Sequence, residues 1–113
     1  MVKAVFKVSS EEISLSMTGH ADYNPGNDIV CSAISALAYT LAGTLEHMNK
    51  RNLNDFELQH AENDGDFICI VSKMARYTEK IKTIFQTIYI GLKQIENQYP
   101  EHINIVLVGD FSS

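Results

Sequence analysis

The sequence predicts a two-layer α/β sandwich of the α+β class, with two helices packed on one face of a five-stranded sheet. Two observations carry this prediction. Five short segments show the alternating or continuous apolar patterns of strands, and two longer segments place apolar residues three and four positions apart, as helices do. Their order is β-β-α-β-β-α-β. Because each helix has one apolar face, a single sheet face can cover both.

The first half of the chain predicts a hairpin followed by a helix. Residues 2–8 alternate between apolar and polar side chains, a turn follows at residues 9–12, and residues 13–18 alternate again. The two segments therefore form a hairpin. The first helix begins after Asp28, a good N-cap residue, and ends near Lys50 or Arg51.

The second half predicts a second hairpin, a second helix and a last strand. Residues 56–60 and 66–72 are strands joined through Asn63-Asp64-Gly65, where the Asp-Gly pair favours a tight turn. The second helix runs from about Arg76 to Tyr99 and stops at Pro100. Residues 103–108 are apolar at nearly every position, which predicts a strand inside the sheet rather than at its edge.

Composition limits the classes of function. The chain has 113 residues, 45% of them hydrophobic and 20% charged, and a net charge of −5, which predicts one domain over residues 1–113. The acidic balance argues against direct nucleic-acid binding and suits a basic partner. We expect no membrane partner, because we find no secretory signal and no apolar run near membrane-spanning length. The chain is therefore expected in the cytoplasm, with both cysteines reduced.

Residues 19–31, GHADYNPGNDIVC, predict the chemistry. Cys31 falls in the first turn of the first helix, where the helix dipole favours the thiolate, so it is the candidate nucleophile. The backbone N–H groups of Cys31 and Ser32 in that turn could hold an oxyanion. His20 follows Gly19 and is the candidate base, because the ten-residue loop can fold back toward Cys31. We expect this pair to be loose in the free protein.

Two further polar residues support this site in the prediction. Asp28 could cap the helix or orient His20, and both roles stay open. Ser35 lies one helical turn after Cys31, where its hydroxyl could line the site or bond back to a helix carbonyl. Tyr23 in the loop could cover a substrate or pack the loop down.

The remaining cysteine and histidines do not suggest a metal or cofactor. Cys69 shares the parity of its apolar neighbours in a strand, which predicts a buried core thiol. His47, His60 and His102 have no partner at metal-ligand spacing. The prediction therefore includes no metal and no cofactor.

The motif resembles the ribosomal-processing cysteine protease family, Prp. The match consists of Gly19-His20-Ala21 and Asp28-Ile29-Val30-Cys31-Ser32, and it is densest over residues 19–38. The resemblance implies a homodimeric endopeptidase that uses a Cys31–His20 dyad, with Gly19, Asp28 and Ser35 at other signature positions. It implies a substrate as well, the N-terminal extension of a bacterial large-subunit ribosomal protein, cut after an aromatic residue. Residues 21–27 would be the mobile segment that closes over the peptide.

Two other functions remain open on sequence grounds. One is a ribosome-associated protein-binding module without catalysis. The other is a redox-sensing thiol protein that uses Cys31, which would gain support if Cys69 lay beside it. Only the protease requires both His20 and Cys31.

Overall fold

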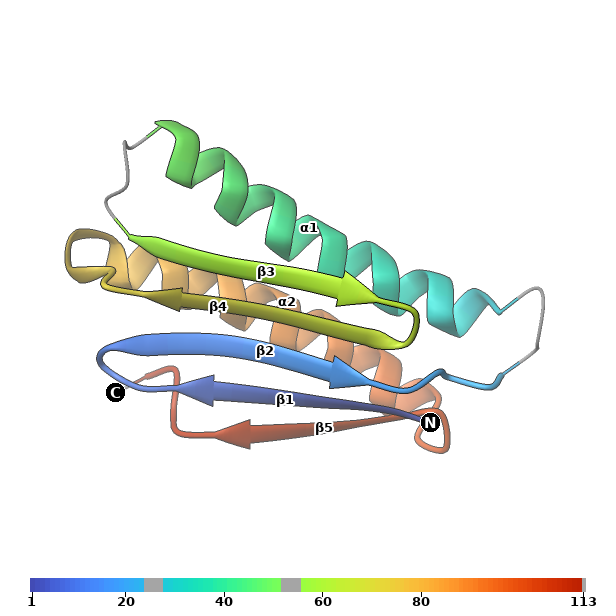
Figure 1. Ribbon diagram of the computed structural model, residues 1–113. Coiled ribbons are helices and arrows are strands. Elements are labelled where there is room, and N and C mark those ends of the chain that lie inside the picture. The colour runs from blue at the N-terminus through green and yellow to red at the C-terminus, as the bar shows by residue number, and fades with distance from the viewer. Residues whose placement is uncertain (24–27, 52–55, 113) are drawn as a thin grey trace.

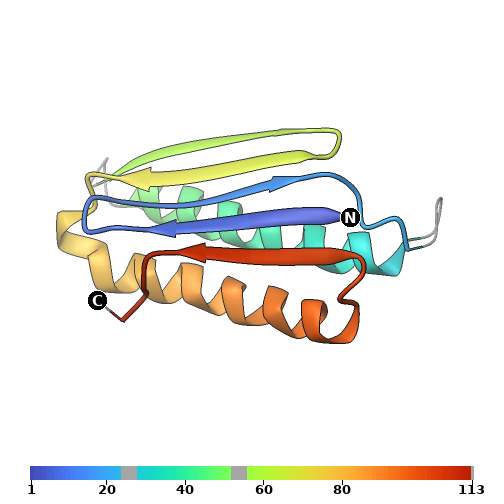
Figure 2. The same cartoon turned by 90° about the horizontal axis from the view of Figure 1, so that it is seen from below.

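The strands and helices follow the predicted order β-β-α-β-β-α-β. The computed structural model describes residues 1–23, 28–51 and 56–112. Its elements are β1 (Val2–Val8), β2 (Glu12–Thr18), α1 (Ile29–Arg51), β3 (Glu57–Asn63), β4 (Asp66–Ser72), α2 (Thr78–Gln98) and β5 (Ile103–Val108). Both helices cover the same face of the sheet, as two views of the ribbon show (Figure 1, Figure 2). The predicted fold class is confirmed.

The sheet has the strand order β3-β4-β2-β1-β5 (Figure 1). Three of its four pairings are antiparallel, and β1 runs parallel to β5. The register pairs Thr18 of β2 with Asp66 of β4. This pairing matters for the site, because it brings the end of β2 beside the turn of the β3–β4 hairpin.

The core lies between the sheet and the helices. Alternate residues of each strand point inward, as the strand periodicity predicts, and the apolar stripe of each helix faces them. The largest fully buried side chains come from both layers: Phe6, Ile13, Leu15, Leu41, Leu45, Phe56, Phe85 and Leu92. The opposite sheet face is not covered by any element in the described ranges (Figure 2).

The prediction that residues 103–108 lie inside the sheet is wrong. β5 is an edge strand that pairs only with β1. Its apolar composition has a different cause, because Ile103 is fully buried and Ile105 and Leu107 pack against the core. The side chain of Glu96 on α2 accepts a hydrogen bond from the backbone N–H of Ile105 at 2.6 Å. A carboxylate thus satisfies a donor that an edge strand would otherwise expose.

Two predicted boundaries also shift. β3 extends to Asn63, three residues beyond the predicted end, because its polar residues pair with β4 while remaining exposed at the sheet edge. The predicted second helix opens with a 3₁₀ turn over Ala75–Tyr77, and α2 proper begins at Thr78. Such 3₁₀ turns are common at helix N-termini.

One expectation about membrane segments needs correction. α1 is long and apolar enough to cross a membrane by length and composition alone, with a mean hydropathy of 1.5 over an 18-residue window within Ile29–Lys50. A core helix passes the same test, and α1 contributes Val30, Ile34, Leu41 and Leu45 to the core. The helix therefore meets the length criterion while packing as one layer of the sandwich.

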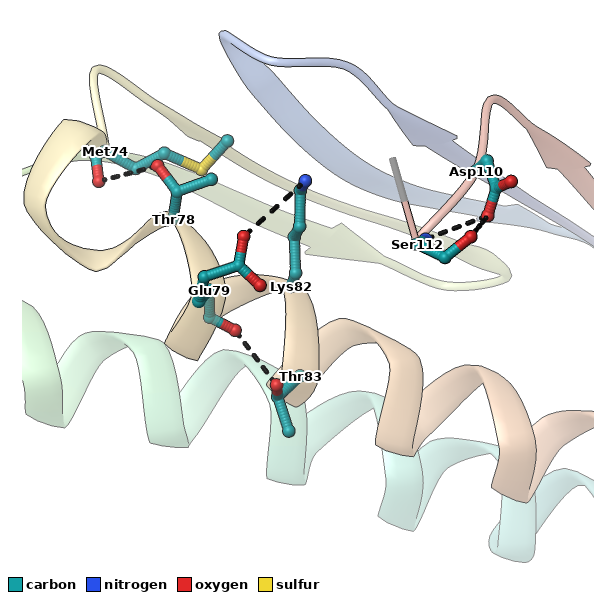
Figure 3. A network of polar contacts seen from close by, with 7 residues as sticks. All are labelled: Met74, Thr78, Glu79, Lys82, Thr83, Asp110 and Ser112. Carbon is teal, nitrogen blue, oxygen red and sulfur yellow. Dashed lines mark hydrogen bonds and ion pairs between the residues drawn. The ribbon is translucent and has the colours of Figure 1, made fainter.

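A buried lysine marks the beginning of α2 (Figure 3). Lys82 is 8% exposed, and its Nζ lies 4.0 Å from the Oε1 of Glu79. Asp110 accepts hydrogen bonds from the backbone N–H and the hydroxyl of Ser112, which lower the pKa of its carboxyl; the nearby Lys82 charge lowers it further. The hydrogen bonds lie within the C-terminal segment, and the charge of Lys82 interacts with that segment from α2.

Cys69 provides a test of this packing. Its side chain is fully buried, and burial raises the pKa of its thiol to about 12. Because only the thiolate reacts readily, we expect iodoacetamide at pH 8 to modify the partly exposed Cys31 in the folded protein while sparing Cys69. Peptide mapping by mass spectrometry checks this, and both thiols should react in urea. Equal labelling of the two in the folded state would contradict the buried placement.

Candidate active site

The start of α1 is built around Asp28. Its Oδ1 accepts the backbone N–H of Cys31 at 2.8 Å, and its Oδ2 accepts the backbone N–H of Tyr23 at 2.9 Å. Asp28 is thus the helix cap, and it also ties the preceding loop to the helix. Of the two roles that the sequence left open, the structure shows the cap.

This cap changes the predicted oxyanion hole. The N–H of Cys31 donates to the Asp28 carboxylate, and the N–H of Ser32 donates to the Asp28 carbonyl at 3.0 Å. Both groups that the sequence assigned to the oxyanion therefore donate to Asp28 in the substrate-free structure. The physical reason is that a good N-cap uses the same donors that an oxyanion would need.

Gly19 sets the position of His20 at the end of β2. Its φ of +94° lies in the region that favours glycine, and a Cβ here would fall 2.4 Å from the carbonyl oxygen of Met1. A side chain at this position would therefore displace the beginning of β1. Because β2 ends here, His20 leaves the sheet with its side chain about half exposed.

The turn of the β3–β4 hairpin lies against His20. The N–H of Gly19 donates to the carbonyl of Gly65 at 2.7 Å, and a Cβ on Gly65 would lie 3.0 Å from the Nε2 of His20. Asp64, the preceding turn residue, has its Oδ1 3.6 Å from the same nitrogen. The carboxylate beside His20 is thus Asp64 rather than Asp28. The sequence had marked Asp64 only as a turn residue.

His20 and Cys31 line one cavity of about 450 Å³. Gly19 and Ser35 line it too, so four of the six site residues predicted from the sequence meet there. Asp28 and Ser32 do not line the cavity, and Asp28 caps the helix that carries Cys31. The other walls are apolar side chains of the sheet and α1 and the polar hairpin turn: Val2, Met17, Ile34, Ala38, Tyr39, Phe67, Glu62, Asn63, Asp64, Gly65 and Asp66. In the part of the chain that the structure describes, no hydrogen bond joins His20 to Cys31.

The first residues of the loop are anchored to the end of α2. The ring of Tyr23 packs edge-on against Tyr99 and His102, at centroid distances of 5.3 and 5.2 Å. The Nδ1 of His102 donates to the carbonyl of Ala21 at 2.8 Å. Tyr23 therefore packs the loop down, one of its two predicted roles. Residues 24–27 of the predicted mobile segment lie outside the described residues.

No group of three or more His, Cys, Asp or Glu side chains suited to a metal ion occurs in the described ranges. Cys69 does not line the cavity and is fully buried, so the structure does not place it as a resolving thiol for Cys31. The chemistry available in this cavity is a partly exposed thiol at a helix start and an imidazole that lines the same cavity. These are the groups of a cysteine hydrolase.

Comparison with known proteins agrees with that class. The family model described as cysteine protease Prp matches residues 1–104, and the chain therefore belongs to this family of cysteine proteases. It is 27% identical to the ribosomal processing cysteine protease Prp of Staphylococcus aureus over 90 residues, which are 79% of this chain and 80% of that protein.

Solved structures extend the similarity over almost the whole fold. An essential ribosomal processing protease Prp from S. aureus, crystallised with a covalently linked product peptide, matches with a TM-score of 0.77 and 25% identity, covering 95% of this chain and 99% of that one. A Streptococcus mutans protein matches with a TM-score of 0.68 and 27% identity, covering 97% and 96%.

The Asp28 cap leads to a stability prediction. Replacing Asp28 with Ala removes the acceptor for two backbone N–H groups, so we expect the free energy of unfolding to fall by about 1–2 kcal/mol. Asp28→Asn keeps an acceptor and should lose less. Urea denaturation followed by circular dichroism measures both variants. An alanine variant as stable as the parent would show that the cap contributes nothing.

Proposed function

We propose that this protease removes the N-terminal extension of a bacterial large-subunit ribosomal protein, using Cys31 as nucleophile and His20 as base. The observation that carries the proposal is that these two side chains line the same cavity although ten residues separate them in sequence. Family membership and the product-bound S. aureus relative support a peptide substrate. The ribosomal identity of that substrate rests on the names of the relatives.

The proposed reaction proceeds through a thioester. The Sγ of Cys31 adds to the scissile carbonyl carbon, while His20 takes the thiol proton and passes it to the leaving amine. Water then attacks the thioester with His20 again as base, which releases the acid and restores the thiol. Because no hydrogen bond joins the two side chains in the free structure, substrate binding must close the remaining gap.

The apolar wall of the cavity supports cleavage after an aromatic residue. Met17, Ile34, Tyr39 and Phe67 line the cavity beside Cys31. Apolar and aromatic side chains are the usual lining of a pocket that receives an aromatic ring. A cavity of about 450 Å³ also leaves room for such a side chain.

The polar wall supports a basic peptide. Glu62, Asp64 and Asp66 come from one hairpin end and line the cavity together. The whole chain carries a net charge of −5. Such an acidic rim attracts lysine and arginine side chains, which suits the basic segment of a ribosomal protein. We infer a cytoplasmic location from this substrate and from the two unpaired thiols, Cys31 and Cys69, which cell fractionation can test.

The dyad is tested by cleavage of a synthetic peptide that spans the N-terminal extension of the host's own ribosomal protein. We expect one cut by the parent protein and none by Cys31→Ala. His20→Ala should lower kcat/KM by about 10²–10⁴-fold, because it removes the general base. Mass spectrometry identifies the cut and the residue that precedes it.

His47→Ala is the matched control for the histidine, since His47 is an exposed residue of α1 that does not line the cavity. It should cleave at the parent rate. A folded parent protein that leaves the peptide intact but retains it in a pull-down would instead favour the non-catalytic binding module. Cleavage that survives Cys31→Ala would exclude the proposed nucleophile.

We also propose that the chain forms a homodimer. The open sheet face supports this, since it presents Ile68 and Val108 at 38% and 52% exposure on strands that no described element covers. Burying this face against a second copy would remove apolar surface from water.

Sedimentation equilibrium tests the dimer and its surface. The parent should have twice the 12.7 kDa chain mass, and Ile68→Lys should shift it toward the monomer because a charge would be buried in the contact. Ile90→Lys is the control, since Ile90 is an exposed residue of α2, in the other layer. A parent protein with the mass of one chain would contradict the dimer.

A further inference from the structure

We propose that Asp64 is a positioning residue for His20, so that the catalytic unit is Cys31–His20–Asp64 rather than a dyad. This inference rests on the proposed roles of Cys31 and His20. Its basis is the placement of the Asp64 carboxylate, whose Oδ1 lies 3.6 Å from the Nε2 of His20. That separation is an ion-pair distance when the imidazole is protonated, and it is slightly longer than a hydrogen bond.

The backbone fixes this placement. β3 and β4 pair up to Asn63 and Asp66, which leaves Asp64 and Gly65 as a two-residue turn. Gly65 has a φ of +81°, and its carbonyl accepts the N–H of Gly19, the residue before His20. The turn that carries the carboxylate is therefore hydrogen-bonded to the segment that carries the imidazole.

Gly65 also limits where the imidazole can lie. A Cβ at this position would be 3.0 Å from the Nε2 of His20 and 3.5 Å from Cδ2 and Cε1, so the Nε2 edge of the ring faces the turn backbone. A glycine lets the ring approach this closely. The ring is thus seated on the turn with Nε2 toward Asp64.

Asp28, the carboxylate that the sequence offered as a partner for His20, is already used by the backbone. Its Oδ1 binds the N–H of Cys31 and its Oδ2 binds the N–H of Tyr23. Orienting His20 would require it to give up part of the helix cap. Asp64 is the turn carboxylate that the structure pairs with His20.

The chemistry follows from which nitrogen faces the carboxylate. A carboxylate beside Nε2 favours the tautomer that carries its proton there, which leaves Nδ1 to accept the proton of the Cys31 thiol. It also stabilises the imidazolium that forms when the proton arrives. In the free protein water screens the pair, because the two side chains are 54% and 98% exposed. A peptide in the cavity would exclude some of that water and strengthen the interaction.

A matched pair of substitutions separates positioning from simple attraction of a basic substrate. Asp64 and Asp66 are both exposed acids that line the cavity, but the structure pairs only Asp64 with His20. Each variant removes one charge from the acidic rim, so both should raise KM. Asp64→Asn, which keeps the size of the side chain, should in addition lower kcat about 5-fold, the upper end for an exposed ion pair. Asp66→Asn reports the loss of rim charge alone, so its effect should fall on KM. A kcat of Asp64→Asn no lower than that of Asp66→Asn would overturn the proposal.

A second measurement needs no substrate. We would follow the rate of Cys31 alkylation by iodoacetamide against pH for the parent, His20→Ala, Asp64→Asn and Asp66→Asn. Losing the carboxylate makes the imidazolium less stable, so the profile of Asp64→Asn should move to higher pH, in the same direction as that of His20→Ala. The other titratable side chains lining the cavity are Tyr39, Glu62 and Asp66, and Asp66→Asn controls for their general charge.

The outcomes distinguish the two proposals. If His20→Ala moves the alkylation profile and Asp64→Asn does not, the pair of Cys31 and His20 stands and the role of Asp64 fails. If His20→Ala leaves the profile unchanged, the proposed base is wrong and the role of Asp64 falls with it. If both move it and Asp66→Asn does not, the positioning role is supported.

Discussion

The hydrogen bond from the N–H of Gly19 to the carbonyl of Gly65 is the contact on which the active site depends. It follows directly from the sheet, because the register pairs Thr18 with Asp66 and so places the next residues opposite each other. The same turn that accepts this hydrogen bond also lies against the His20 ring, since a Cβ on Gly65 would be 3.0 Å from its Nε2. The central strand pairing therefore positions the imidazole, while the start of α1 positions the thiol.

Asp28 imposes the second constraint, since one carboxylate holds both the first turn of α1 and the loop residue Tyr23. The same N–H of Cys31 cannot serve the cap and an oxyanion at full strength. A substrate oxygen bound at the helix start would compete with Asp28 for the N–H of Cys31. Displacing Asp28 would weaken the helix cap and the hydrogen bond that Asp28 accepts from the N–H of the loop residue Tyr23. In the free structure, the N–H groups that could bind an oxyanion are therefore the ones that stabilise the helix start.

Local patterns were enough to predict most of the fold and half of the site. Helix spacing placed Cys31 in the first turn of α1, and the Asp-Gly pair located the second hairpin. The edge position of β5 could not be predicted, because inward-facing apolar residues give the same sequence pattern on an edge strand as on a central strand. The contact of Asp64 with His20 could not be predicted either, because it depends on a long-range pairing of β2 with β4, which no local spacing encodes.

The arrangement also explains how an exposed turn residue, Asp64, can act on His20. Asp64 is almost fully exposed, so water and salt screen the interactions of its charge. Its position is nevertheless fixed by the paired strands β3 and β4 and by the Gly19–Gly65 hydrogen bond. A carboxylate held in this way costs the free protein little desolvation energy. A peptide that fills the cavity lowers the local dielectric and so strengthens the interaction of the Asp64 carboxylate with the His20 imidazolium. This interaction is therefore strongest when the scissile bond is in place.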